Sequence, residues 1–198
     1  MKQLTYLLTI LLLALPVQSF SQEKPDQAKD PIKPALLVID IQNAFLPMMS
    51  EKDKETGMNN INAYINLFRS QGYPIIRVYH SSKEYGVVDG TEAFEFPSSV
   101  VIKPEDAKVI KTYPDGFNKT DLDKVLREKG CNTVFLCGLS AVGCVLATYI
   151  GANNHDYKAF LVKDALISHN PDYTNSIEEI FDALSYEVIS LIIKGPGK

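Results

Sequence analysis

The chain has 198 residues, of which 45% are apolar and 22% are charged, a composition typical of one globular domain with a sizeable core. Its 20 basic and 24 acidic residues give a net charge of −4, which argues against nucleic acid as a partner. We find no low-complexity tract and no internal repeat at solenoid periods in the sequence.

The start of the chain has the features of an export signal followed by a linker. Lys2 supplies a basic start, Leu7–Leu15 has the length of a signal-peptide core, and Ser19 and Ser21 place small residues where signal peptidase cuts. The apolar run is shorter than the ~20 residues of a spanning helix. We therefore expect an exported, periplasmic protein with no membrane anchor in its mature form. The chain divides into a signal peptide (1–21), a flexible leader (22–33) and a folded domain (34–198).

Strand and helix patterns alternate after the leader. Continuous apolar runs of strand length predict strands at 35–39, 74–79, 108–110, 133–137, 158–162 and 187–193. Apolar residues at helical spacing predict helices at 58–71, 120–129, 145–150 and 177–184. This alternation is typical of a three-layer α/β/α fold, a Rossmann-like arrangement around a central, mostly parallel six-stranded sheet.

The segment 132–145, NTVFLCGLSAVGCV, concentrates the chemical signals. It predicts a buried strand, a tight turn bounded by Gly138 and Gly143, and then Cys144 at the start of an apolar helix. Unpaired N–H groups and the helix dipole favour a thiolate at such a helix start, so we interpret Cys144 as a nucleophile. The alternative is that Cys144 is a buried small hydrophobe, which is the commonest fate of a free cysteine.

The other two cysteines are weaker candidates. Cys131 lies in a predicted helix-to-strand turn, and Cys137 lies inside the apolar strand, where burial keeps a thiol protonated. An exported protein with three cysteines leaves at least one thiol unpaired or pairs it between chains, which fits a free catalytic thiol. A disulfide between Cys137 and Cys144 would disable the site, and the sequence leaves that pairing open. A thiol-redox function is disfavoured because this pair lacks the Cys-x-x-Cys spacing.

Two polar residues end other predicted strands. Asp40 follows the first strand and Lys111 follows the third. In open α/β sheets the ligand crevice lies beyond the carboxyl ends of the strands, where the strand order reverses. There a carboxylate would take the proton of a thiol, and an ammonium would stabilise both charges. Without Cys144, the two residues would be interpreted as an ordinary strand-end aspartate and a solvated lysine.

Three separated blocks resemble the isochorismatase-like cysteine hydrolases, a family that includes nicotinamidases and other small-amide hydrolases. ALLVIDIQNAF at 35–45 resembles the block that carries the family's general base. VIK at 109–111, followed by Phe117, resembles the lysine block, and GLSAVGCV at 138–145 resembles the nucleophile block. Because the order and spacing of all three blocks agree, the resemblance covers residues 34–193.

The resemblance implies that the chain hydrolyses an amide. Asp40 would take the proton of Cys144, Lys111 would support the pair, and the sulfur would attack the carbonyl to form an acyl-enzyme thioester. Water would then hydrolyse the thioester. The family also implies a cis peptide bond between Leu139 and Ser140, and an oxyanion hole made by the backbone N–H groups of Ser140 and Cys144.

The resemblance also suggests substrate contacts and an assembly. Phe45 and Phe117 match positions where family members line the pocket, and core packing is the alternative for both. His80, at the end of the second predicted strand, is a candidate substrate contact or a structural histidine. Relatives are usually dimers or tetramers, so we expect this chain to form a homo-oligomer. We expect its ligand to be a small amide substrate.

The sequence departs from the family pattern in places. Ala44 stands where many relatives carry an aspartate, and Ala141-Val142 replaces a common Thr-Asp pair. Nicotinamidases hold a metal with an aspartate and several histidines after their second strand, whereas 80–85, HSSKEY, lacks His-x-x-His spacing. We therefore predict no metal and no other cofactor, and we rank nicotinamide low as a substrate.

Two alternative functions stay open. A non-catalytic relative would bind a small molecule in the same pocket without turnover. An isochorismatase-type ether hydrolase would share the fold without depending on a cysteine. The presence of Asp40, Lys111 and Cys144 together favours the amide hydrolase over both.

Overall fold

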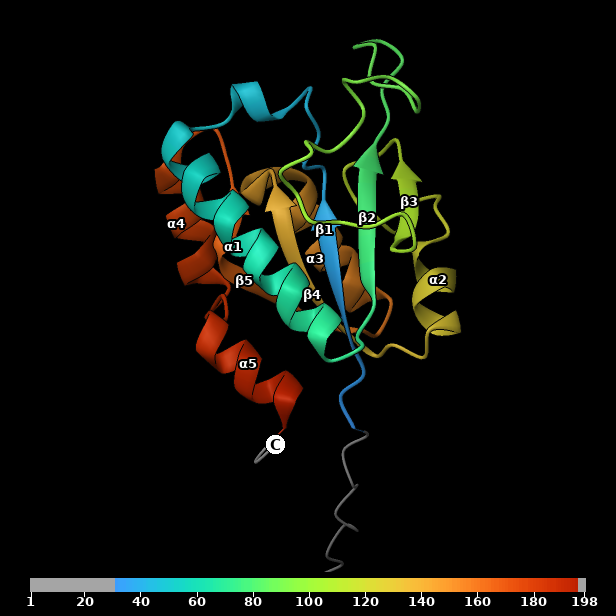
Figure 1. Ribbon diagram of the computed structural model, residues 1–198, viewed down its shortest axis with the longest axis vertical. Helices are drawn as coiled ribbons and strands as arrows, with labels where there is room; N and C mark the ends of the chain where they lie inside the picture. Colours follow the sequence, from blue (N-terminus) through green and yellow to red (C-terminus); the bar gives the residue numbers. More distant parts are fainter. Residues whose placement is uncertain (1–30, 196–198) are drawn as a thin grey trace, which may run out of the picture. The chain divides into compact units, whose positions relative to one another are not determined.

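A computed structural model describes residues 31–195, which contain an open parallel sheet (Figure 1). Its strands are β1 (Pro34–Ile39), β2 (Ile75–His80), β3 (Ala107–Lys111), β4 (Thr133–Leu139) and β5 (Lys158–Ile167). All their pairings are parallel, in the order β3-β2-β1-β4-β5. The predicted signal peptide and most of the predicted leader lie outside the described residues. Within residues 31–195, no helix is long and apolar enough to cross a membrane.

Helices cover both faces of the sheet. They are α1 (Glu51–Ser70), α2 (Leu122–Glu128), α3 (Leu146–Asn154), α4 (Pro171–Ile180) and α5 (Tyr186–Lys194). Residues of α1 and α5 belong to one hydrophobic core, and residues of α2, α3 and α4 belong to a second core on the opposite face (Figure 1). The predicted α/β/α architecture is therefore confirmed.

Two helices begin earlier than the apolar spacing predicts, because polar side chains cap them. Ser50 Oγ accepts a hydrogen bond from the Asp53 N–H at 3.1 Å, and this starts α1. Asn170 Oδ1 accepts one from the Asp172 N–H at 3.0 Å, with Pro171 in the first turn of α4. Such caps satisfy N–H groups that the first helical turn leaves unpaired.

The predicted sixth strand is wrong, because residues 187–193 form most of α5 and the described sheet has five strands. Ile189 and Ile193, four residues apart, are buried, whereas Val188 and Leu191 are 42% and 72% exposed. This spacing is that of a helix with one apolar face on the core. The β-branched residues of the segment favour a strand by propensity, and tertiary packing outweighed that preference.

Gly138 allows β4 to approach β1 closely at the carboxyl end of the sheet. Its φ is +117°, and a Cβ at this position would overlap the backbone of Ile39, its partner in β1. A residue with a side chain would therefore push the two strands apart. The glycine thus shapes the place where the candidate site is found.

Candidate active site

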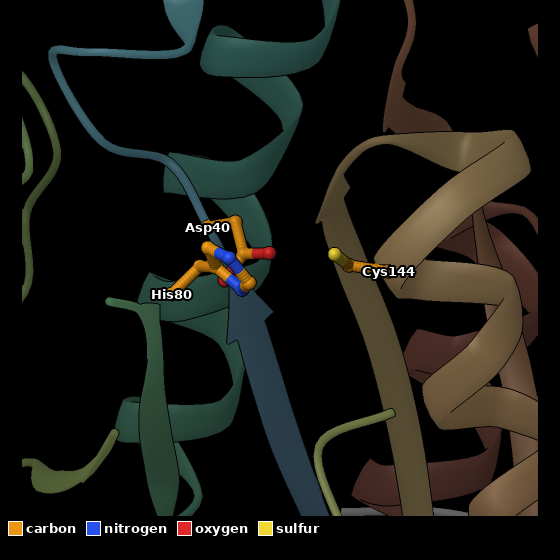
Figure 2. Close-up of side chains that lie close together, drawn as sticks. All are labelled: Asp40, His80 and Cys144. Atoms are coloured by element: carbon orange, nitrogen blue, oxygen red, sulfur yellow. The ribbon is translucent and has the colours of Figure 1, made fainter. Parts of the chain in front are cut away.

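The carboxyl ends of β1 and β4 flank the point where the strand order reverses. The chain adds β2 and β3 on one side of β1, and β4 and β5 on the other. Asp40 directly follows β1, and Cys144 lies in the turn between β4 and α3. Figure 2 shows the two side chains pointing toward each other across this region. Open α/β sheets bind their ligands at such a point.

A buried ion pair joins Asp40 to Lys111, the last residue of β3. Lys111 Nζ lies 2.7 Å from Asp40 Oδ2, and the side chains are 0% and 3% exposed. The other carboxylate oxygen, Asp40 Oδ1, is buried and has no hydrogen-bond partner among the described residues. Buried polar atoms are normally paired, so this oxygen is a candidate proton acceptor in a reaction.

The structure brings Cys144 close to Asp40, which pairs with Lys111, and to His80. A carboxylate oxygen of Asp40, a ring nitrogen of His80 and Cys144 Sγ all lie within 4.8 Å of one another (Figure 2). Cys131, Cys137 and Cys144 are all free thiols, so the pairing that the sequence left open is not formed. Cys144 is partly exposed, whereas the other two cysteines are buried. The accessible thiol is therefore the one beside the carboxylate.

Burial governs the protonation of the pair. It raises the pKa of Asp40 above the ordinary value of 3.8, and the charge and hydrogen bond of Lys111 oppose this shift in part. Burial and the Asp40 charge raise the pKa of the Cys144 thiol to about 12, against the opposing charge of Lys111. Desolvation therefore opposes the thiolate that the helix start was expected to stabilise. The resting thiol is neutral, and its proton must leave as it attacks.

His80, the last residue of β2, stands beside the ion pair. Lys111 Nζ lies 3.2 Å from His80 Nδ1, and the Phe45 ring packs edge-on at 6.0 Å between centroids. The buried Gln42 side chain donates from Nε2 to the His80 carbonyl oxygen at 3.0 Å. Its Oε1 accepts from the His80 N–H at 2.7 Å. Gln42 therefore pairs with the His80 backbone as a residue of a neighbouring strand would. The position of Gln42 in the block 35–45 did not reveal this role.

The turn after β4 contains the two backbone N–H groups that are predicted to form an oxyanion hole. The peptide bond between Leu139 and Ser140 is cis, where the resemblance places it. The Ser140 carbonyl oxygen accepts hydrogen bonds from the N–H groups of Gly143 at 2.9 Å and Val145 at 3.2 Å. These two bonds close the turn without using the N–H groups of Ser140 and Cys144. An oxyanion hole formed by those two groups stays a prediction that this turn allows.

A cavity of about 260 Å³ opens beside the thiol. Apolar side chains from the turn after β1 and polar groups from the strand ends line it: Asp40, Phe45, Met48, Met49, His80, Leu139, Ser140, Gly143 and Cys144. Sequence reasoning missed Met48 and Met49, because neither a motif nor a spacing separates a pocket methionine from a core one. Asp40 is the one carboxylate among these lining residues, and no lysine or arginine is among them.

Phe117 lies elsewhere in the fold. Its ring stacks on His155 at 4.8 Å between centroids, lies 5.7 Å from the ring of Tyr157, and is 6% exposed. Phe117 is thus not among the residues that line the cavity, and it packs in the core that contains residues of α2, α3 and α4. Phe45 and His80, the other predicted contacts, do line the cavity.

Asp40, His80 and Cys144 have donor atoms of the kind that bind metal ions. The Lys111 ammonium, however, lies 2.7 Å from Asp40 Oδ2 and 3.2 Å from His80 Nδ1. The positive charge of Lys111 therefore lies next to both Asp40 Oδ2 and His80 Nδ1. It would repel a metal ion bound by the same two atoms. Lys111 thus opposes a metal ion at these two atoms, and the absence of a metal from this site stays a prediction.

Comparisons with known proteins agree with this geometry. The family model described as the isochorismatase domain matches residues 34–190. An uncharacterized isochorismatase family protein of Bacillus subtilis (strain 168), YddQ, is 32% identical over 136 residues, which cover 66% of this chain and 76% of that protein.

Solved structures with the same fold include two amidases. N-carbamoylsarcosine amidase from Thermoplasma acidophilum is 27% identical with a TM-score of 0.66, and the match covers 78% of this chain and 95% of that one. The pyrazinamidase of Pyrococcus horikoshii, solved in complex with zinc, is 30% identical with a TM-score of 0.65, over 76% of this chain and 94% of that one. Because the family model matches residues 34–190 and the sheet has the same fold, this chain belongs to the isochorismatase family, whose members include amidases.

Proposed function

We propose that this chain is a cysteine hydrolase that cleaves the C–N bond of a small neutral amide. One observation carries the proposal. A buried carboxylate at Asp40, held on one oxygen by Lys111, leaves its other oxygen unpaired close to the accessible thiol of Cys144. A neutral thiol needs such a base to become a nucleophile at neutral pH.

The first half of the reaction acylates the enzyme. Cys144 Sγ attacks the carbonyl carbon while its proton passes to Asp40, so a C–S bond forms and the carbonyl oxygen gains negative charge. The N–H groups of Ser140 and Cys144 stabilise that charge. The tetrahedral intermediate then collapses, the C–N bond breaks, and the nitrogen takes the proton from Asp40. Ammonia or an amine leaves, and a thioester remains on Cys144.

The second half hydrolyses the thioester. A water molecule gives a proton to Asp40 as its oxygen attacks the acyl carbon. The C–S bond then breaks, and the sulfur takes that proton back from Asp40. A carboxylic acid leaves and the neutral thiol is restored. Throughout the cycle Lys111 holds Asp40 Oδ2, which keeps Oδ1 free for each proton transfer.

The cavity and the similar proteins support this choice of substrate. The cavity lining has four apolar side chains, Phe45, Met48, Met49 and Leu139, and no lysine or arginine to bind an anion. N-carbamoylsarcosine amidase and pyrazinamidase, two proteins of the same fold, are both amidases by name.

A screen of ammonia release from small neutral amides tests the proposal. The wild-type chain should hydrolyse members of the screen, and Cys144→Ala should be slower by at least ~10³-fold because the nucleophile is lost. Cys131→Ala is the matched control, since this buried thiol lies outside the cavity lining, and it should keep the wild-type rate.

Three results would contradict the proposal. Equal rates for the wild-type chain and Cys144→Ala would exclude a cysteine hydrolase. Binding of amides without any turnover would favour the non-catalytic relative. Hydrolysis of an enol ether that survives in Cys144→Ala would favour the ether hydrolase.

A further inference from the structure

Lys111 decides which nitrogen of the His80 ring carries a proton. Lys111 Nζ lies 3.2 Å from His80 Nδ1, within hydrogen-bond distance. A lysine ammonium has three donors and no acceptor, so Nδ1 must be the acceptor in this contact. A neutral imidazole with an accepting Nδ1 carries its proton on Nε2.

The surroundings of His80 keep its ring neutral. Lys111 and Asp40 are the charged groups that face it, from β3 and from the end of β1. Burial and the positive charge of Lys111 lower the pKa of His80, and the Asp40 charge opposes them as the smallest of the three effects. A second proton on the His80 ring would lie on Nδ1 and point at the positively charged Nζ of Lys111.

The ring is fixed as well as neutral. His80 is the register partner of Lys111 in the β2–β3 pairing, so both side chains leave the sheet at the same level. Gln42 binds the His80 backbone on both its N–H and its carbonyl, and Phe45 packs against the ring. Among the described residues, Nε2 of His80 has no hydrogen-bond partner. An oriented donor is thus left unused in the wall of the cavity that also contains Cys144.

We propose that His80 Nε2–H anchors the substrate by donating a hydrogen bond to an acceptor atom next to the scissile carbonyl. This inference rests on the proposed amide hydrolysis. The preferred substrates are neutral amides with an ether oxygen, a carbonyl oxygen or an unprotonated ring nitrogen beside the amide group. A substrate that presents an N–H there would meet the proton on Nε2 and bind less well.

Nuclear magnetic resonance of the unliganded chain tests the proton position directly. Long-range ¹H–¹⁵N spectra of ¹⁵N-histidine-labelled protein distinguish a protonated from an unprotonated ring nitrogen, and the chain has three histidines. The His80→Leu spectrum assigns the signal. We expect Nε2 protonated and Nδ1 unprotonated near neutral pH, and a mixture of both tautomers in Lys111→Met. A ring protonated on Nδ1, or on both nitrogens, would overturn the inference.

Alkylation with iodoacetamide then places an amide acceptor in the cavity. Cys144 Sγ displaces iodide, an S–C bond forms and the thiol proton is released, which tethers a carboxamide to the sulfur. The His80 Nε2 proton should shift downfield in the alkylated chain as it binds the carboxamide oxygen. An unchanged His80 signal in fully alkylated protein would count against the inference. A Cys144 that does not alkylate would count against the proposed function. In that case the tautomer of the His80 ring in the unmodified chain still decides the inference.

A matched pair of substrates measures the effect on turnover. 2-Methoxyacetamide and butyramide have nearly the same shape and differ in one ether oxygen. Wild-type kcat/KM should favour the ether by about tenfold, the effect of one good hydrogen bond. His80→Leu should lose this preference, chiefly through KM, and His80→Gln, which keeps an N–H donor, should retain part of it. A preference as large in His80→Leu as in the wild-type chain, or one that is absent in the wild-type chain while both amides are hydrolysed, would overturn the inference.

Discussion

Asp40 and Lys111 depend on each other because both side chains are buried. Lys111→Met leaves a buried carboxylate without its counter-charge, and we expect the free energy of unfolding to fall by about 3–5 kcal/mol. The double variant with Asp40→Asn should recover more than half of this loss, because no unpaired charge remains. Urea unfolding at neutral pH measures both values.

The neighbouring lysine in the same strand provides the control. Lys108 pairs with Asp89 near the surface, where the side chains are 31% and 56% exposed. Lys108→Met should therefore change the free energy of unfolding by less than about 1 kcal/mol. A double variant as unstable as Lys111→Met would mean that lost packing, rather than an unpaired charge, causes the instability.

The pKa of Asp40 predicts where activity is lost in acid. The acid limb of kcat/KM reports the base of the free enzyme, and a protonated Asp40 cannot accept the proton of Cys144. Because burial raises the pKa of Asp40, activity should disappear as pH falls through a value above the ordinary 3.8. The pH profile of kcat/KM for butyramide checks this. The limb should persist in His80→Leu, and a limb that vanishes there would assign it to His80.

At the scale of residues, the sequence predicted three side chains that the structure brings together, and it missed the contacts that orient the neighbouring His80. Asp40, Lys111 and Cys144 each follow a strand, and a resemblance in three blocks singled them out. The clamp of Gln42 on His80 depends on which strand lies next to β1, which apolar runs do not encode. Phe117 lies outside the cavity lining because an aromatic side chain that follows a strand-end lysine packs equally well into the core.

Among the structural elements, the meeting of β1 with β4 depends on one glycine. Gly138→Ala would place a Cβ against the Ile39 backbone at a positive φ. We expect the free energy of unfolding to fall by more than ~3 kcal/mol, with loss of activity, because the two strands that carry the site must separate. Circular dichroism during thermal unfolding measures the loss.

Gly130 supplies the matched control for this substitution. It also has a positive φ, of +67°, but nothing lies within 4 Å of the Cβ that an alanine would add. Gly130→Ala should therefore cost only about 1 kcal/mol of backbone strain. Equal losses from the two variants would show that backbone conformation, and not the approach of β4 to β1, sets the effect.

Apolar runs predicted strands correctly where every residue of the strand is buried. The prediction was least accurate at the end of the chain. β1 is buried at all six positions, so its apolar run has one interpretation. Segment 187–193 has the same composition but half of it faces solvent as α5, and composition alone does not separate these cases. The starts of α1 and α4 were missed because Ser50 and Asn170 cap polar first turns.

Across the described domain, the strand order creates the site. His80 and Lys111 end β2 and β3, and Asp40 directly follows β1, which lies beside β2. Cys144 follows β4 across the reversal point. Residues far apart in the sequence therefore meet at one edge of the sheet. The alternation of strands and helices predicted the layers. The cavity composition depends on side-chain packing, and no local pattern in the sequence specifies it.

The most direct test of the central claim is to find the acyl group. The chain is quenched with acid during hydrolysis of a small amide, digested, and its peptides are weighed by mass spectrometry. We predict an acyl group on Cys144 that hydroxylamine removes, as expected for a thioester, and unmodified Cys131 and Cys137. Ammonia release with no acyl group on Cys144, or with the acyl group on another residue, would contradict the account.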